Sequence, residues 1–280
     1  MATHLEKAIQ FVNNNGDSFQ KNYFASLFGA DNLQVTLEKL SEYQNPDGGW
    51  IRIDPDYQGT VSSITCTMGG FGKLERLNVE KSELINRSIA YLRQVQKATG
   101  MWDEPDEIIS FNPPRWYFPR ISDNRIWFTN GMLRYVISRK PEEKEMISNA
   151  RQYLRPFWGG SSFPGYDHNN WMGIVSFSNS DCETDMDIYQ GCLKNLRRDI
   201  RNYDLADVVW TLESCYFLKL PVDEEVVSAG IELLLSGQSE DGGFGTEYGE
   251  FQRADVTIEA LDSLANYGVV PRRIDIFSGE

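Results

Sequence analysis

Three segments of this 280-residue chain share one pattern, which constrains the fold more than any other feature. In each, a Leu stands four residues before a Gln, and the Gln is followed by three residues, a Gly, one further residue and an aromatic side chain. The segments are 40–50, 92–102 and 234–244. A Gly at this place ends a helix and permits a positive φ, and a Gln amide can satisfy backbone groups at a helix end. The first two copies lie about 50 residues apart, a spacing that indicates an array of helix pairs.

Apolar residues recur at helical spacing through most of the chain, and no alternation typical of strands persists. The sequence therefore predicts an all-α protein with eleven helices. They are expected at 3–14, 17–28, 32–44, 60–77, 82–96, 123–138, 142–155, 184–197, 204–219, 222–237 and 254–267. Residues 158–181 are expected to form a long loop, and 154–163 resembles a copy of the pattern that has lost its Gln.

Composition excludes several classes of function. A net charge of −14 disfavours nucleic acid and anionic membrane surfaces as partners. The chain contains no run of eighteen apolar residues, so no transmembrane segment is expected. Residues 1–10 carry charges where a signal peptide needs an apolar stretch, and the four cysteines show no disulfide spacing, so a cytoplasmic protein is expected. His4 and His168 alone are too few for a Ser-His-Asp triad or a multi-histidine zinc site.

The repeated Gln-to-aromatic segment resembles the QW repeat of squalene-hopene and oxidosqualene cyclases and of the related protein prenyltransferase β subunits. The resemblance implies a single (α/α)6 toroid domain over residues 1–280, with outer and inner helices alternating around a central cavity. Twelve helices are then expected, and the missing one is an outer helix between about 198 and 203. In that family the repeat is structural. A stabilising role is therefore implied for Gln44, Trp50, Gln96, Trp102, Gln238 and Phe244.

The same resemblance implies an aspartic acid that donates a proton to the substrate. These cyclases protonate an alkene or epoxide with the middle Asp of a D-x-D-D motif at the start of an inner helix. In segment 183–189, Asp185 and Asp187 match the first and third positions, so Asp187 is the expected proton donor and Asp185 its partner. Ile188 replaces the last Asp. The alternative is that Glu183 and Asp185 only cap a helix and complement its dipole.

A second acidic helix start lies at 253–257, directly after the third repeat copy. It resembles D-x-D-x-T with the first Asp replaced by Arg253, and Asp255 is the second candidate acid. A capping or solvated role for Asp255 remains the alternative. Asp204 and Asp207 are expected to be ordinary carboxylates at a helix start.

Segment 111–128 combines prolines, arginines and aromatic residues, and its prolines prevent a helix before about Ser122. Its guanidinium groups are expected to hold a diphosphate, and its aromatic side chains to cover a hydrocarbon chain. These residues are Arg115, Arg120, Arg125, Trp116, Tyr117, Trp127 and Phe128. Trp171 and Tyr189 are further candidates for substrate contact. The alternative is a packed surface loop whose arginines pair with acidic residues.

No metal site is expected from the sequence. The acidic loop 103–107 has the carboxylate density to bind Mg2+, but it is expected to be a solvated loop. Asp181 and Cys182 resemble part of the prenyltransferase zinc site, but no His follows them in the sequence.

These features favour an enzyme, a class II-type terpene cyclase of the isomerase or lyase kind. Its expected substrate is a linear C15–C20 prenyl diphosphate rather than squalene. No cofactor is required, and Mg2+ would assist only with a diphosphate. The alternative functions are a noncatalytic toroid that binds a lipid, peptide or protein in its cavity, and a different chemistry on the same scaffold.

Overall fold

The structure, a computed structural model, describes residues 4–29 and 32–272. These residues form helices and isolated bridges but no strand. The α-helices are α1 His4–Asn15, α2 Ser18–Phe28, α3 Leu33–Ser41, α4 Ile64–Arg76, α5 Glu83–Val95, α6 Ser122–Arg139, α7 Lys144–Leu154, α8 His168–Ser176, α9 Glu183–Asp199, α10 Leu205–Phe217, α11 Glu225–Gly237 and α12 Arg253–Asn266. Short 3-10 helices lie at η1 Asp106–Phe111, η2 Arg115–Tyr117, η3 Arg155–Phe157, η4 Ile200–Asn202 and η5 Glu250–Gln252.

The eleven predicted helices are confirmed, but the twelfth is not where the pattern placed it. It is α8, inside the segment expected to be a loop, whereas 200–202 forms only the short helix η4. Every residue of α8 after His168 is buried. A helix covered on all sides shows no apolar stripe, so hydrophobic periodicity cannot detect it.

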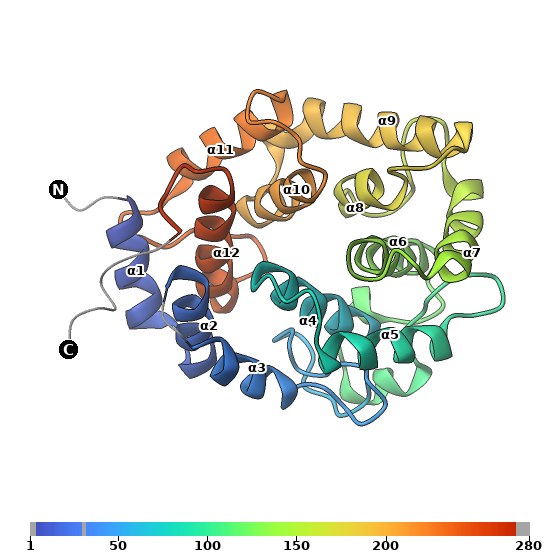
Figure 1. Ribbon diagram of the computed structural model, residues 1–280, viewed down its shortest axis with the longest axis horizontal. Helices are drawn as coiled ribbons and strands as arrows, with labels where there is room; N and C mark the ends of the chain where they lie inside the picture. Colours follow the sequence, from blue (N-terminus) through green and yellow to red (C-terminus); the bar gives the residue numbers. More distant parts are fainter. Residues whose placement is uncertain (1–3, 30–31, 273–280) are drawn as a thin grey trace. The chain divides into compact units, whose positions relative to one another are not determined.

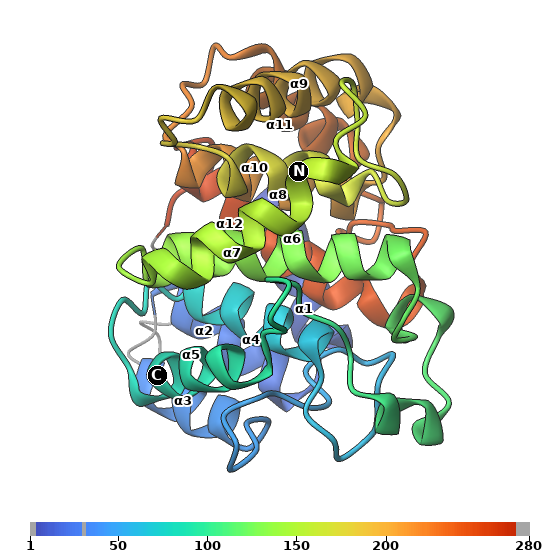
Figure 2. The same cartoon turned by 90° about the vertical axis from the view of Figure 1, so that its right-hand side faces the viewer.

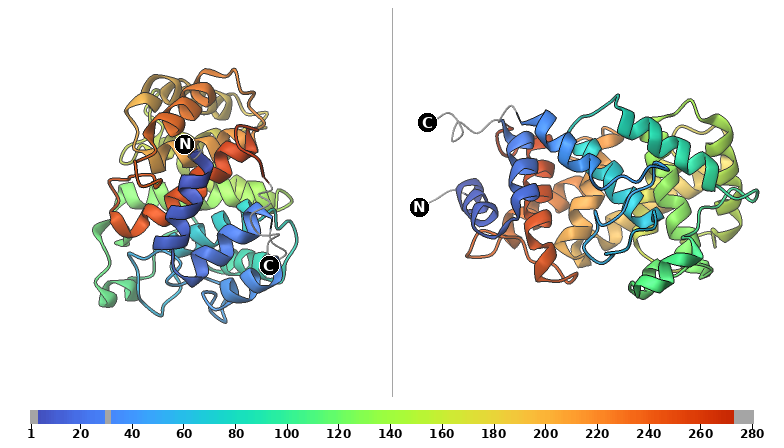
Figure 3. Two further views of the ribbon diagram at one scale, coloured as in Figure 1. Left: turned by 90° about the vertical axis from the view of Figure 1, so that its left-hand side faces the viewer. Right: turned by 90° about the horizontal axis from the view of Figure 1, so that it is seen from below.

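The described helices fall into two compact units. One comprises Met1–Lys39 and Leu196–Glu280, and the other comprises Leu40–Asn195. In the first unit α12 packs against α1, α2 and α10, and α10 packs against α11. Figure 3 shows α1 lying along α12 within this unit.

In the second unit α6 packs against α4, α7 and α8 (Figure 1). Figure 2 shows α7 lying across α6, and the η1–η2 segment, drawn in green, at the edge of the unit. As predicted from its prolines, this segment forms no α-helix before α6 begins at Ser122.

The three Gln side chains of the repeat make equivalent contacts. Gln44, Gln96 and Gln238 each donate through Nε2 to the carbonyl oxygen of the Gly four residues later, at 3.1, 3.0 and 2.8 Å. Each also donates to a backbone carbonyl in another helix. The acceptors are Leu84 of α5, Met146 of α7 and His4 of α1, at 2.9, 3.1 and 2.8 Å. The end of each helix is thereby fixed to one neighbouring helix.

The Gly residues of the repeat fit against the same neighbouring helices. Gly48, Gly100 and Gly242 have φ of +94°, +91° and +92°. A Cβ at any of them would collide with a backbone carbonyl oxygen, that of Arg87, Asn149 or Lys7 respectively. Each of these carbonyls lies three residues after the one that accepts from the Gln. The axial register between helices is therefore the same in all three copies.

The aromatic residues of the repeat are buried, and their backbone N–H groups bond to threonines. Trp50, Trp102 and Phe244 donate to Thr67 of α4, Thr129 of α6 and Thr257 of α12, at 3.2, 3.1 and 3.0 Å. Each threonine is buried, and each belongs to the next α-helix along the chain, as the fourth, eighth and fifth residue of α4, α6 and α12. The repeat is thus also bonded to the α-helix that follows it.

The segment that lost its Gln keeps a related contact. Gly159 N–H still closes the turn on the Ser162 carbonyl at 3.1 Å. Here Asn195 of α9 donates to the Ser161 carbonyl at 2.8 Å. The turn after α7 is therefore held to α9 by Asn195, a side chain of α9, whereas the other three turns are held by their own Gln side chain.

Candidate functional site

The two residues expected to start the reaction lie in the first turns of α9 and face different surroundings. Asp187 is exposed. Asp185 is buried, and its carboxylate accepts hydrogen bonds from Arg155 Nε and Nη2 at 2.7 and 3.0 Å and from Ser180 Oγ at 2.7 Å. Helical residues two apart point in nearly opposite directions, which explains the difference.

Asp185 is held in its ionised form. Burial raises its pKa, but the hydrogen bonds from Arg155 and Ser180 and the charges of Arg155 and Arg151 outweigh burial, so the pKa lies below its ordinary value. A proton donor needs a neutral carboxyl in a dry site. The surroundings contradict the expected roles of both residues: Asp185 is an ion-paired structural residue, and Asp187 faces solvent. Tyr189 lies half-buried on the same helix, and its contact with a substrate stays a prediction.

Two of the three arginines in segment 111–128 pair with acidic side chains. Arg125 Nε donates to Asp103 Oδ2 at 2.7 Å, and the Arg120 guanidinium pairs with Asp106. Arg115 lies exposed in η2. The expected diphosphate clamp is therefore not assembled by Arg120 and Arg125, and the alternative role, pairing with acids, is confirmed for both.

The aromatic residues of this segment are distributed over different environments. Trp116 is 40% exposed. Tyr117 is buried and donates from its hydroxyl to Asp54 Oδ2 at 2.7 Å. Burial raises the pKa of Tyr117 well above its usual value, so its hydroxyl stays protonated. Tyr117 therefore packs between loops, while Trp116 remains accessible.

Trp127 and Trp171 come together in a group that we call the α6–α8 aromatic cluster, which consists of Trp127, Phe128, Tyr166, His168 and Trp171. The His168 ring lies 5.9 Å from Trp127 and from Tyr166 and 4.6 Å from Trp171, measured between ring centres. Phe128 is fully buried 5.3 Å from Trp127. Burial lowers the pKa of His168 to about 4. At neutral pH the cluster is therefore uncharged.

In the acidic loop after Trp102, Asp103 and Glu104 are buried, which corrects the expectation of a solvated loop for these two residues, whereas Asp106 and Glu107 are exposed. Glu104 is buried, and its carboxylate caps α4: Oε1 accepts from Ser63 Oγ and Thr65 N, and Oε2 from Ile64 N, each at 2.8 Å. Burial raises the pKa of Glu104 to about 7, although these hydrogen bonds oppose the rise. Both oxygens are directed at the helix end, so Glu104 is a capping group.

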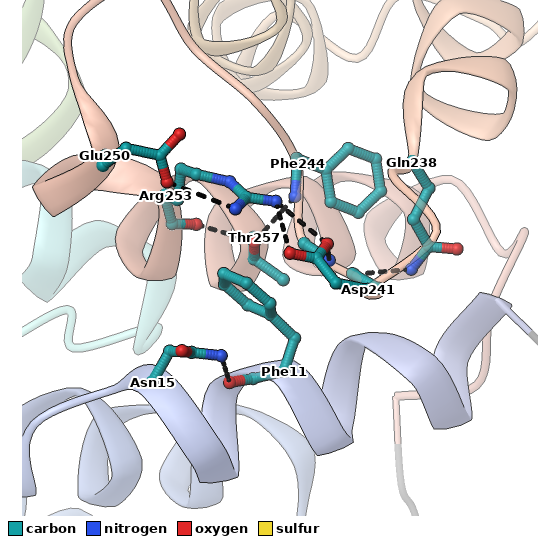
Figure 4. A network of polar contacts seen from close by, with 10 residues as sticks. Phe11, Asn15, Gln238, Asp241, Phe244, Glu250, Arg253 and Thr257 are labelled. Atoms are coloured by element: carbon teal, nitrogen blue, oxygen red, sulfur yellow. Dashed lines mark hydrogen bonds and ion pairs between the residues drawn. The ribbon is translucent and has the colours of Figure 1, made fainter.

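Arg253 stands where the D-x-D-x-T segment has its first Asp. Its Nη2 donates to both carboxylate oxygens of Asp241 at 2.9 and 3.0 Å, and its Nη1 to Glu250 at 3.2 Å (Figure 4). The guanidinium carbon lies 4.7 Å from the centre of the Phe11 ring. Arg253 thus fixes the start of α12 against the turn after α11 and against α1.

Asp255 lies in the first turn of α12 and is half-buried. Its Oδ2 accepts a hydrogen bond from Gln20 Nε2 of α2 at 2.7 Å. The start of a helix favours a negative charge, because its backbone N–H groups carry partial positive charge. That partial charge stabilises the carboxylate form of a side chain in this turn.

Asp255 shares one face of α12 with a second carboxyl, Glu259, four residues later. Glu259 is buried and its Oε2 accepts from Trp210 Nε1 of α10 at 3.2 Å. The Trp210 ring lies 5.5 Å from that of Tyr248, whose hydroxyl donates to Asp207 Oδ1 at 2.9 Å. We call these five residues the α10–α12 cluster. In it the half-buried Trp210 and Tyr248 contact Glu259 and Asp207, and Asp255 lies one turn before Glu259 on α12.

Sequence reasoning found Asp255 but missed most of this cluster. Asp207 was expected to be an ordinary carboxylate at a helix start, and Trp210, Tyr248, Glu259 and Gln20 were not identified. Two signals were present, because Asp207 and Trp210 are three residues apart and Asp255 and Glu259 are four apart, both spacings that share a helix face. No local signal could reveal Gln20, which lies 235 residues from Asp255.

Among the described residues, no group of three or more His, Cys, Asp or Glu side chains is arranged to hold a metal ion. No helix in the described ranges is long and apolar enough to cross a membrane.

No known family model and no curated protein sequence matches this chain. Solved structures do match. Point variants of the type II terpene cyclase MstE from Scytonema are similar to it, one in complex with the product merosterolic acid A (TM-score 0.59, 15% identity, 92% of this chain and 86% of that one). Another holds the substrate geranylgeranyl dihydroxybenzoate (TM-score 0.58, 13% identity, 93% and 86% covered). At this identity the likeness shows the fold alone: the chain has the all-α toroid fold class of these type II terpene cyclases.

Proposed function

We propose that this chain is a class II-type terpene cyclase in which Asp255 protonates a linear isoprenoid. The observation that carries the proposal is the half-buried Asp255 carboxyl in the first turn of α12, with one oxygen held by Gln20. The likeness in fold to type II terpene cyclases supports this reaction class.

The chemistry needs one proton and no redox cofactor. The O–H bond of neutral Asp255 breaks, its proton forms a C–H bond with one carbon of an alkene, and the other alkene carbon becomes a cation. Further alkenes of the chain attack in turn and close the rings. The last cation loses a proton to a base or water, so the product is an isomer of the substrate. The faces of Trp210 and Tyr248 suit cationic intermediates, since aromatic rings attract positive charge.

For the substrate we propose a C15–C20 isoprenoid, taken up by a single toroid domain formed by the whole chain. The geranylgeranyl chain of the MstE substrate supports this length. The headgroup is a separate question, because Arg120 and Arg125 already pair with Asp106 and Asp103. A diphosphate and an aromatic headgroup are therefore tested side by side.

The test incubates the purified protein with geranylgeranyl dihydroxybenzoate, geranylgeranyl diphosphate, farnesyl diphosphate and squalene, each with and without Mg2+. Mass spectrometry after chromatography detects cyclic products of unchanged mass. We expect a cyclic product from a C15 or C20 substrate and its loss in Asp255→Asn, because the amide cannot give a proton. Asp187→Asn makes the same chemical change at an exposed position and should leave product formation unchanged.

The pair of variants makes the assignment falsifiable. Product lost in Asp187→Asn and kept in Asp255→Asn would return the acid to α9. Product kept in both would retain the cyclase but remove Asp255 as its acid. No turnover of any of the four substrates would contradict the cyclase.

A second candidate function, a noncatalytic toroid that binds a lipid, peptide or protein, is favoured by one observation. Arg253 replaces the first acidic residue of the motif and is engaged with Asp241 and Glu250. On this account Asp255 is a capping residue. Wild-type protein and Asp255→Asn would then bind geranylgeranyl dihydroxybenzoate equally, without turnover, in a titration of tryptophan fluorescence.

A further inference from the structure

Apolar side chains gather on the surface of the segment between α5 and α6, within the second unit. Ile109 and Phe111 of η1 and Trp116 of η2 are 40%, 38% and 40% exposed. Among the described residues, no other stretch of eight contains three large apolar side chains exposed to this degree. Single exposed apolar residues are ordinary, whereas a group of them marks an interaction surface. Figure 2 shows this segment at the edge of the second unit.

The exposed side chains belong to a segment whose backbone is fixed to the rest of the unit. Ile108 and Tyr117, each next to one of the exposed residues, are fully buried. Asn124 Nδ2 of α6 donates to the carbonyl oxygens of Arg115 and Phe118 at 3.0 and 2.9 Å. The exposure of the apolar side chains is therefore a property of the folded unit.

The buried ring of Tyr57 connects η1 with η2. Its centre lies 5.9 Å from that of Phe111 and 5.6 Å from that of Tyr117, the residue after Trp116. Phe111 and the neighbour of Trp116 thus pack on the same buried ring, which keeps the two short helices together.

The charge of this segment differs from that of the chain. Residues 108–122 contain two arginines and no Asp or Glu, in a chain with a net charge of −14. Arg115 is exposed, and the side chain of Arg120 is 70% exposed although it pairs with Asp106. Guanidinium groups bind phosphate oxygens, and Trp side chains favour the boundary between lipid and water. We call the exposed residues of this segment the η1–η2 surface, which consists of Ile109, Phe111, Arg115, Trp116 and Arg120.

We propose that the η1–η2 surface docks the protein onto a zwitterionic lipid bilayer. In the docked state the three apolar side chains enter the boundary between headgroups and acyl chains, and the two guanidinium groups lie at the level of the lipid phosphates. A zwitterionic lipid such as phosphatidylcholine offers these phosphates without a net surface charge, whereas the charge of the whole chain opposes an anionic surface. A protein docked in this way lies on the membrane and needs no spanning helix. The proposal goes beyond the proposed function, because binding to a bilayer does not depend on turnover.

Cosedimentation of the full chain with phosphatidylcholine vesicles tests the proposal. We expect the wild type to bind, and its partition coefficient to fall about tenfold in Trp116→Ala and in Ile109→Ser, because one large apolar side chain no longer leaves water. Both positions are exposed, so the thermal midpoint should stay unchanged. Val222→Ser is the matched control. It removes an aliphatic side chain that is 51% exposed in the first unit and should leave binding unchanged.

Brominated phosphatidylcholine identifies the residue that enters the bilayer, because bromine on the acyl chains quenches a tryptophan that contacts them. The chain has seven Trp residues, so the variant Trp116→Phe assigns the signal. It keeps an aromatic side chain in the η1–η2 surface and should still bind the vesicles, but the quenching should be lost. Quenching that is unchanged in Trp116→Phe would overturn the contact of Trp116 with lipid.

The remaining outcomes decide between the bilayer and other partners. No binding of the wild type to phosphatidylcholine, or equal binding of wild type, Trp116→Ala and Ile109→Ser, would overturn the proposal. A wild type that self-associates without lipid in sedimentation velocity, and a monomeric Trp116→Ala, would assign the surface to a second copy of the chain instead. Tighter binding to phosphatidylglycerol than to phosphatidylcholine would overturn the zwitterionic bilayer. None of these results depends on cyclase activity, so the docking surface and the proposed function fail separately.

Discussion

Each Gly of the repeat is required for two reasons, its positive φ and the lack of space for a Cβ. Substitutions can measure the two effects separately. Gly100 has φ +91°, and a Cβ there would collide with the Asn149 carbonyl oxygen of α7. Gly160 has φ +80°, but a Cβ there would meet nothing within 4 Å. Backbone strain thus affects both positions, while steric collision affects only Gly100.

We expect Gly100→Ala to lower the free energy of unfolding by about 3 kcal/mol or more, because strain and collision add. Gly160→Ala should cost only about 1 kcal/mol, the strain of a non-Gly residue at positive φ. Urea unfolding of both variants measures the difference. Equal losses would mean that contact with α7 does not require a Gly.

Glu104 gives the stability of the protein a pH dependence whose direction follows from its raised pKa. Between its ordinary value of 4.5 and about 7, the folded chain keeps a proton that the unfolded chain has lost. The free energy of unfolding therefore falls as pH rises through this range, by up to about 3 kcal/mol. Above about 7 the group is ionised in both states and adds no further slope.

Glu104→Gln removes this titration. The wild type should therefore lose stability relative to Glu104→Gln between pH 5 and pH 8, as measured by urea unfolding at both values. A difference between the two proteins that stays constant with pH would show that Glu104 titrates at its ordinary value.

At the scale of elements, α9 shows why an acidic motif read along the chain can mislead. Ile188, Cys192 and Leu196 form its buried face, and Asp185 belongs to that face at helical spacing. Asp187 lies off this stripe and is exposed. The apolar stripe was readable in the sequence, and it would have separated the two carboxyls.

Asp185→Asn and Asp187→Asn form a matched pair on this one helix. We expect Asp185→Asn to cost about 3 kcal/mol of unfolding free energy, because it leaves Arg155 and Arg151 without their buried counterion. Asp187→Asn should change it by less than about 0.5 kcal/mol. Chemical unfolding at pH 7 measures both, and similar small losses would contradict the ion-paired role.

The lowered pKa of Asp185 adds a pH signature to this pair. Its stabilisation is present above the ordinary value of 3.8 and is lost as pH falls through the lower folded-state pKa. The difference in free energy of unfolding between the wild type and Asp185→Asn should accordingly become smaller at acidic pH.

At the scale of the whole molecule, the chain divides into two compact units, yet it is expected to form one domain. The division falls within α3 and α9. Helices form cooperatively, so a boundary inside a helix does not separate independent folding units. We predict one unfolding transition.

Calorimetry together with far-ultraviolet circular dichroism and tryptophan fluorescence checks this prediction. Coincident transitions, with equal calorimetric and van't Hoff enthalpies, are the expected result. Two resolved transitions would divide the chain into two domains and contradict the single toroid domain.

The sequence by itself determined the elements that repeat along the chain. Helical periodicity predicted eleven of the twelve α-helices found in residues 4–29 and 32–272, and the pattern from Leu to aromatic located three helix ends whose Gln and Gly contacts are equivalent. Both signals are local, since they depend on residues within one or two turns. Helical periodicity did not predict α8, because burial on all sides leaves no polar face to contrast with an apolar one.

Only the tertiary structure decided which carboxyl groups are ion-paired, which cap a helix and which accept a hydrogen bond from a side chain of another helix. Asp185, Glu104 and Asp255 all looked alike as acidic residues near a helix or turn. Their partners Arg155, Ser63 and Gln20 lie 30, 41 and 235 residues away. The protonation of a carboxyl depends on the charges, hydrogen bonds and burial around it, and folding brings these together from distant parts of the chain.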